Sequence, residues 1–359
     1  MKRSLSLLLC AALALSLLAG CGPKGASSSQ SSSGSAGGSG SASSEDPSGS
    51  SSGQPPADAP VIDFMALSGP TGVGAAWLMD NYSPDAAPSD APFVLSASVE
   101  ADNQVVSNAL INGDADIAAM ATNVAASLYA KSDGAIQVLC VNTLGVLYLL
   151  EKGDSVHSVA DLRGKTVYAT GQGANPEYIL NYLLTQSDVD PSQVDVQWMT
   201  AQEVTAKMVS SDSGICMLPV PAATALLAKD SDVRQALSLS QAWDLLDQGP
   251  LPMGCIVATT QFIEENPQLV ESYLELYGQS IAYMSDQANL TQGAQLVAEL
   301  GITDSQEIAQ AAIPQCNLTF LTGTEMRSAL EPYYQVLFQA DPASIGGGMP
   351  YDSFYYGAH

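Results

Sequence analysis

The sequence predicts an α/β protein whose sheets are mostly parallel. Strand-like and helix-like segments alternate throughout the chain beyond Pro60, and glycine-rich loops follow several of the apolar strands. The segment from Pro60 to His359 is long enough for two lobes or one large domain.

A first group of elements begins with the apolar strand 61–67, which runs into a loop containing Gly69 and Gly72. Gly113 is expected to end the helix that precedes it, because glycine readily adopts a left-handed conformation at a helix end. The expected strands are 61–67, 93–99, 115–119, 136–142 and 146–150, and the expected helices pass through 77–79, cover 103–111 and begin at 122.

A second group begins near Ser158. Asn175 is expected to cap a helix over 176–184, with Pro176 at the first helical position and Glu177 favourable to the helix dipole. The other expected elements are strands 166–169, 194–198 and 215–218 and helices 202–209 and 222–227. The strand 254–259 is then expected to return to the first group, followed by largely helical sequence over 266–340.

The first 20 residues have the pattern of a lipoprotein signal peptide. Lys2 and Arg3 precede an apolar run, and Leu18-Ala19-Gly20 precedes Cys21, whose thiol could carry lipid. The alternatives are an ordinary secreted protein or a membrane anchor, but the run is short for a spanning helix of roughly 20 residues. Residues 21–59, rich in Ser and Gly, are expected to form a disordered tether. The protein is therefore expected on the extracytoplasmic face of the cell membrane.

The charge balance excludes some partners. The chain has 37 Asp and Glu against 11 Lys and Arg, a formal net charge of −26. Phosphate backbones would repel such a surface, so nucleic acid is not an expected partner.

Four cysteines remain after Cys10 and Cys21: Cys140, Cys216, Cys255 and Cys316. Four allow three disulfide pairings, but their apolar surroundings favour small buried hydrophobes over ligands or disulfides. The chain has no CxxC or Cys/His metal spacing, so no metal site is expected.

Several loops follow apolar strands and mostly precede helices, which is where ligands of open α/β sheets bind. Each loop alone could equally be a helix cap or tight turn, and their recurrence at one topological position favours a site. The candidate ligand-binding residues are Gly69, Pro70, Thr71, Gly72, Thr122, Asn123, Thr143, Gln172, Gly173, Ala174 and Pro219. The five loops contain no Lys or Arg, which favours a neutral or cationic ligand.

Other chemistry has little support in the sequence. Gly72-Val73-Gly74 lacks the third glycine of a dinucleotide fingerprint, and no Gly-Lys-Ser/Thr occurs. His157 fits a surface position, and Asp114 and Asp116 lie at a helix-to-strand turn where charges are routine. We therefore expect no catalytic residue and no cofactor.

Three segments resemble the solute-binding lipoproteins of ABC importers, in the branch related to nitrate, sulfonate and thiamine-precursor binders. They are Asn112-Gly113-Asp114-Ala115-Asp116-Ile117-Ala118, Asp161-Leu162-Arg163-Gly164-Lys165-Thr166-Val167 and Glu265-Asn266-Pro267-Gln268-Leu269-Val270. The resemblance implies a two-lobed type 2 periplasmic-binding-protein fold with two crossing hinge segments. Lobe 1 would contain 60–145 and 253–359, and lobe 2 would contain 146–252.

The resemblance also implies a function. A monomer would capture a small organic solute between its lobes and deliver it to an ABC importer permease. The alternatives are an enzyme on the same fold, of the kind found in menaquinone or thiamine-precursor biosynthesis, and a ligand-sensing partner of a membrane receptor.

Overall fold

The structure is a computed structural model that describes residues 59–358. The predicted signal peptide, Cys21 and nearly all of the predicted tether lie outside the described residues. Within the described range, no helix is both long and apolar enough to cross a membrane.

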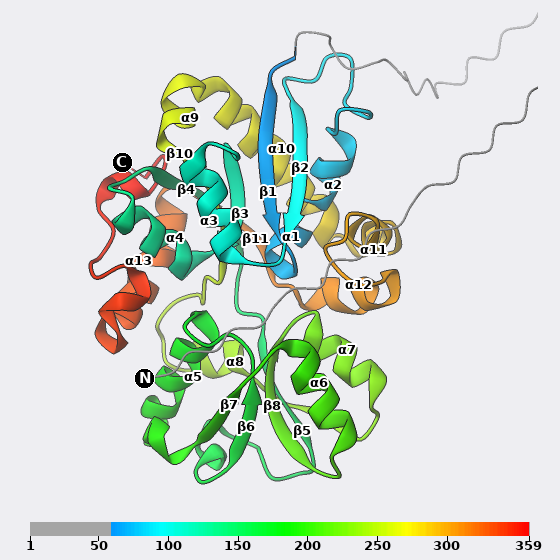
Figure 1. The fold of residues 1–359 in the computed structure, drawn as a ribbon, viewed down its shortest axis with the longest axis vertical. Helices are drawn as coiled ribbons and strands as arrows, with labels where there is room; N and C mark the ends of the chain where they lie inside the picture. Colours follow the sequence, from blue (N-terminus) through cyan, green and yellow to red (C-terminus); the bar gives the residue numbers. More distant parts are fainter. Residues whose placement is uncertain (1–58, 359) are drawn as a thin grey trace, which may run out of the picture. The chain divides into compact units, whose positions relative to one another are not determined.

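Two sheets flanked by helices make up residues 59–358, which confirms the predicted α/β class (Figure 1). Sheet A has the strand order β11-β4-β10-β3-β1-β2 and sheet B the order β7-β6-β8-β5-β9. The strands of sheet A are β1 (Val61–Leu67), β2 (Val94–Glu100), β3 (Ile117–Ala121), β4 (Ile136–Thr143), β10 (Gly254–Thr259) and β11 (Leu318–Thr322). Those of sheet B are β5 (Leu147–Lys152), β6 (Thr166–Ala169), β7 (Asp195–Trp198), β8 (Gly214–Pro219) and β9 (Val233–Ser238).

The α-helices connect the strands and cover both faces of the sheets. They are α1 (Pro70–Val73), α2 (Ala76–Asn81), α3 (Asn103–Asn112), α4 (Thr122–Lys131), α5 (Asn175–Gln186), α6 (Ala201–Ser210), α7 (Ala222–Lys229), α8 (Leu239–Asp244), α9 (Thr260–Glu265), α10 (Pro267–Ser285), α11 (Leu290–Glu299), α12 (Gln306–Ala312) and α13 (Gly323–Ala340).

The prediction of mostly parallel sheets needs correction, because both sheets are mixed. β1 pairs in parallel with β2 and β3, whereas β10 is antiparallel to β3 and β4, and β11 is antiparallel to β4. In sheet B, β6 is parallel to β7 and β8, whereas β5 is antiparallel to β8 and β9.

The two crossings between the sheets explain why β5 and β10 are reversed. Three residues separate the end of β4 from Leu147, where β5 begins, and β10 begins just after the chain returns from sheet B. Each crossing strand enters its new sheet at the edge where the neighbouring parallel strands end. It must therefore run against those neighbours and pair with them in the antiparallel manner.

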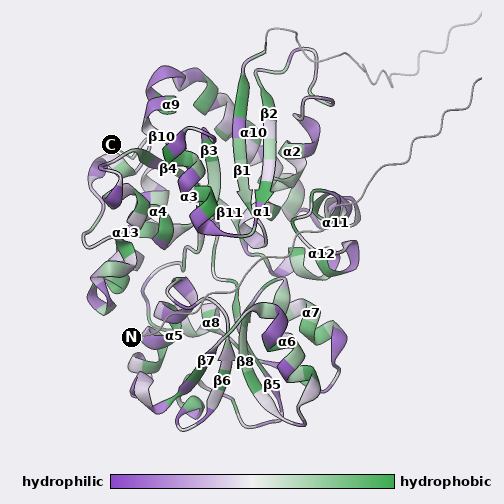
Figure 2. Cartoon of the chain, in the orientation of Figure 1, coloured by the Kyte–Doolittle hydropathy of each residue, from purple (hydrophilic) through white to green (hydrophobic). Residues whose placement is uncertain are grey.

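Burial explains the strand patterns. β1 alternates between exposed and buried residues at its start, whereas β3, β4 and β10 are buried almost throughout, as expected for strands covered on both faces. Figure 2 shows hydrophobic residues along β1 and β3 and hydrophilic residues on helices such as α6. Two apolar cores result, and each contains residues of both sheets.

Two strands and three short helices, α1, α8 and α9, were not predicted from sequence. β9 has no regular alternation of apolar and polar residues, and β11 interrupts the segment 266–340 that was expected to be largely helical. α1 occupies part of the loop expected over 68–74. Short segments with mixed burial carry little periodic signal, which explains these omissions.

The four cysteines are free and buried, as predicted for small apolar residues. Burial raises the pKa of Cys216 and of Cys316 to about 12. Both side chains therefore remain thiols at physiological pH.

A buried carboxylate holds one end of sheet B together. Glu151 on β5 is only 2% exposed, and it accepts hydrogen bonds from Ser155 Oγ at 2.6 Å and Val156 N at 3.1 Å. Arg234 Nη2 on β9 lies 2.6 Å from Glu151 Oε2. Burial alone would raise the pKa of Glu151, but the hydrogen bonds and the Arg234 charge outweigh it and hold this pKa below its usual value of 4.5.

Glu151→Gln should lower the free energy of unfolding at neutral pH by about 2 kcal/mol, because it removes the charge that these donors face. A carboxyl whose pKa is lowered by folding stabilises the protein above its unfolded-state pKa, and this contribution is lost as the pH falls through its folded-state pKa. Denaturant melts should therefore show the difference from wild type shrinking from neutral pH to about pH 3. Exposed Glu264→Gln is the control, and a pH-independent difference would contradict this account.

Candidate functional site

The predicted site residues lie at the carboxyl edges of the two sheets, where the crossing segments join them. In sheet A, β3 ends at Ala121 directly before α4, and β4 ends at Thr143. In sheet B, Pro219 ends β8. The two crossings are bonded to each other, because Met253 N donates to the Thr143 carbonyl at 2.9 Å.

A buried amide fixes the glycine loop after β1. Asn142 Nδ2 donates to the Thr71 carbonyl and to the Tyr277 hydroxyl, both at 2.8 Å. A Cβ added to Gly254 would lie 2.7 Å from Asn142 Oδ1 and 2.9 Å from Thr71 Oγ1. Glycine at the start of β10 thus lets these polar groups approach the backbone closely.

A second buried amide joins the two sheets. Asn175, the first residue of α5, is 2% exposed and donates from Nδ2 to the Met253 carbonyl at 3.3 Å and to Thr122 Oγ1 at 3.4 Å. Its Oδ1 accepts from the Tyr333 hydroxyl of α13 at 2.5 Å. Every partner that the structure gives this side chain lies on the sheet A side. We call Asn175, Thr122, Met253 and Tyr333 the Asn175 network.

Neighbouring groups support the Asn175 network. Thr122 Oγ1 donates to the Pro252 carbonyl at 2.9 Å, and Tyr334 on α13 donates from its hydroxyl to the Thr122 carbonyl at 2.9 Å. Trp243 of α8 packs edge-on against Tyr333 with ring centroids 6.0 Å apart. Burial raises the pKa of Tyr333 above its usual 10.0, so its hydroxyl stays protonated and can donate.

The predicted role of Asn175 as a helix cap is wrong. Ala174 is the N-cap of α5 and makes no side-chain cap bond, while Asn175 lies inside the helix and directs its amide to the Asn175 network. The sequence Asn-Pro-Glu has the local signature of a capped helix start. Only tertiary contacts reveal its other use, so Asn175 and Tyr333 were missed as candidate site residues.

Asn123 is the candidate with the clearest unmet hydrogen-bonding capacity. It is 3% exposed, and its Oδ1 is buried without a hydrogen-bond partner. It is not the cap of α4, whose N-cap is Ala121. Buried polar atoms are rarely left unpaired, and this oxygen is free to accept a hydrogen bond.

The other predicted residues have varied surroundings. Gln172 is exposed, and the N–H of Gly173 already donates to Glu177 Oε2 at 2.7 Å. The backbone at Gly69 has φ of 86°, and a Cβ there would lie 3.8 Å from Pro221 across the two sheets. Gly72 serves the turn, since a Cβ there would lie 2.4 Å from the Leu67 carbonyl oxygen.

The side chains gathered at the sheet edges are uncharged. Thr71, Thr122, Asn123, Asn142, Thr143 and Asn175 are all buried. The amino ends of α4 and α5 meet at the Thr122–Asn175 contact. His157, by contrast, is exposed and lies 3.6 Å from exposed Asp154.

Comparison with known proteins establishes the class of protein. Residues 98–289, more than half of the chain, match the family model described as NMT1/THI5 like. The chain belongs to this NMT1/THI5-like family. No curated protein matches it in sequence.

Solved structures share its fold. An ABC transporter from Parabacteroides distasonis is 21% identical, with a TM-score of 0.68. The match covers 82% of this chain and 98% of the transporter chain. The periplasmic aliphatic sulphonate binding protein SsuA from Escherichia coli is 16% identical, with a TM-score of 0.63. The match covers 79% of this chain and 94% of the SsuA chain. A Candida albicans protein with the generic periplasmic binding protein fold is 13% identical, with a TM-score of 0.54. The match covers 78% of this chain and 90% of the Candida albicans chain. The chain therefore has the periplasmic-binding-protein fold.

The two buried amides should respond differently to truncation. Asn123→Ala should lower the free energy of unfolding by less than about 1 kcal/mol, because its Oδ1 has no hydrogen bond to lose and mainly packing contacts are removed. Asn175→Ala should lower it by about 2 to 3 kcal/mol, because the buried Tyr333 hydroxyl loses its acceptor and the Met253 carbonyl keeps only the Thr122 N–H. Denaturant melts measure both, with exposed Gln172→Ala as control. Equal losses for the two variants would contradict the assignment.

Proposed function

We propose that the protein is a lipid-anchored solute-binding protein that captures a small organic solute between two lobes and delivers it to an ABC importer permease. The observation that carries the proposal is the set of buried, uncharged polar side chains at the facing sheet edges, including the unpaired Asn123 Oδ1. The family match and the sulphonate-binding protein among the structural neighbours support it.

The proposed lobes follow the sheets. Lobe 1 contains residues 60–145 and 253–359, with sheet A, and lobe 2 contains 146–252, with sheet B. Two short crossing segments would allow the lobes to rotate as a hinge. The Asn175 network would hold them together, because separating the lobes strands buried donors and acceptors unless water replaces their partners.

The rival functions differ in what they require. An enzyme on this fold would need a reactive group at the sheet edges, whereas the side chains gathered there are threonines and asparagines. A sensor partner would bind a solute in the same way but act on a receptor. We therefore propose a non-catalytic monomer whose partner is a permease, and copurification with permease components in detergent would separate import from sensing.

The solute class follows from the same residues. Lys and Arg are absent from the loops at 69–72, 121–123, 143–145, 171–174 and 218–221. Oxyanions usually require such partners, although helix amino ends can also hold them. We propose a neutral or cationic solute.

A thermal-shift screen tests the function. The compounds are amines, vitamins and nucleobases, as candidates for the proposed solute class, and simple sulfonates and nitrate, as oxyanions for comparison. A true ligand at 100 times its dissociation constant should stabilise the protein by roughly 2.7 kcal/mol. Asn123→Ala should weaken the response severalfold, because the ligand loses about 1 kcal/mol of hydrogen bonding. Preferential stabilisation by sulfonates would overturn the solute class, and a response unchanged in Asn123→Ala would overturn the site.

Membrane attachment tests the proposed anchor. Cys21→Ser should release the protein from membranes or stall its processing, because a hydroxyl cannot form the thioether that carries lipid. Fractionation of cells followed by detection of the protein decides between the outcomes. Normal processing with unchanged membrane partitioning would show that Cys21 is not the anchor.

A further inference from the structure

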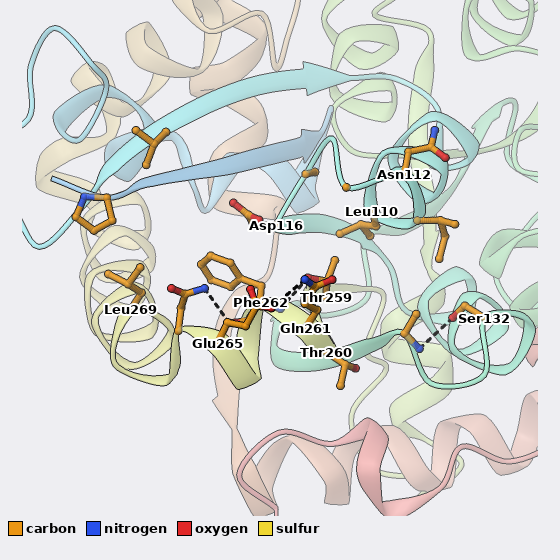
Figure 3. A pocket seen from close by; sticks show the side chains of 17 residues that line it. Leu110, Asn112, Asp116, Ser132, Thr259, Thr260, Gln261, Phe262, Glu265 and Leu269 are labelled. Carbon is orange, nitrogen blue, oxygen red and sulfur yellow. Dashed lines mark hydrogen bonds between the residues drawn. The ribbon is translucent and has the colours of Figure 1, made fainter. Parts of the chain in front are cut away.

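A cavity opens at the edge of sheet A that is opposite the proposed solute site. Its volume is about 750 Å³, and it lies where β1, β3 and α9 begin and where α3 and α4 end. None of the residues proposed for the solute site lines it. Figure 3 shows Leu110, Asp116, Phe262 and Glu265 around it.

Polar and apolar side chains both line this cavity, and some of the apolar ones are open to solvent. Leu110 and Phe262 are nearly buried, whereas Val61 is 55% exposed and Ile111 is 50% exposed. Large apolar side chains with this exposure are uncommon among the described residues. Their presence on one cavity indicates a surface suited to an apolar body.

Two carboxylates, Asp116 and Glu265, are the charged groups of the cavity. Asp116 is half-buried, and Oδ2 accepts from Asp63 N at 3.0 Å. Burial raises the pKa of Asp116, and the nearby Asp63 charge adds to this. Glu265 lines the mouth, with Oε1 accepting from Gln261 Nε2 at 2.9 Å. No Lys or Arg occurs among the described residues that line the cavity.

Helix ends of both signs line the cavity, because α9 begins at Thr260 and α10 has its N-cap at Asn266. α3 ends at Asn112 and α4 has its C-cap at Ser132, and both residues line the cavity. The carboxyl end of a helix carries a partial negative charge and the amino end a partial positive charge, so these contributions offset each other here. Lys131 in the last turn of α4 is exposed and is not a lining residue. The net charge of the cavity therefore comes from Asp116 and Glu265. Carboxylates that share a cavity with apolar side chains are best matched by a cation that carries its own apolar group.

We propose that this cavity binds a small amphipathic organic cation, an ammonium or guanidinium group on an apolar body, at a site separate from the proposed solute site. The cationic group would lie against Asp116 with Glu265 at the mouth, and the apolar body would contact Leu110, Ile111 and Phe262. The proposal does not depend on the proposed function.

The test uses 2-phenylethylammonium as probe and 2-phenylethanol as its uncharged counterpart. Calorimetric titration of the full-length protein at low salt should show saturable binding of the cation, at least fivefold tighter than that of the alcohol. Asp116→Asn should weaken binding of the cation about fivefold to tenfold, and Asn112→Lys, at an exposed position on the cavity, should weaken it at least as much.

Two controls locate the binding. Exposed Glu264→Gln, on α9 but not lining the cavity, should leave the affinity within about twofold of wild type. Asn123→Ala should also leave the affinity for the cation unchanged, because Asn123 does not line this cavity. The result is therefore independent of whether the proposed solute site is correct. Absence of saturable binding, equal affinity for the alcohol, or full affinity in folded Asn112→Lys would each overturn the proposal.

Discussion

The direction of the two crossing segments determines much of this structure. A chain that leaves sheet A at the end of β4 and enters sheet B at the edge where β6 and β8 end must run against those strands. The return crossing imposes the same condition on β10 in sheet A. Both reversed strands have partners on each side, so the crossings are anchored inside the sheets. The carboxyl ends of the remaining parallel strands, with the helix starts that follow them, are thereby brought to one shared edge.

That shared edge explains why uncharged polar side chains are buried there. Backbone groups at strand ends and helix starts need partners, and Asn142 and Asn175 provide them within an otherwise apolar environment. Asn175 belongs to the sheet B side, yet its amide is paired with Thr122, Met253 and Tyr333. The same groups that satisfy the backbone thus connect the proposed lobes.

Sequence reasoning predicted the parts of the fold that have a periodic signal. Strands such as β1 and β10 and helices such as α3 were predicted within about two residues of their observed bounds. It also identified Thr122, Asn123 and Thr143 at the correct strand ends. It could not show that Asn175 bonds to Tyr333, 158 positions along the chain, because local sequence carries no trace of that contact. The cavity around Asp116 was missed for the same reason, since its walls come from four separate segments.

The central claim is that the Asn175 network holds two mobile lobes together before any solute binds. The most direct test is the distance between nitroxide labels at Val105 on α3 and Val209 on α6, both exposed, measured by pulsed electron double resonance without ligand. The four native thiols among the described residues are buried and should not be labelled. The account predicts one narrow distance distribution for wild type and an added, longer population for Tyr333→Phe. Superimposable distributions for the two proteins would contradict it.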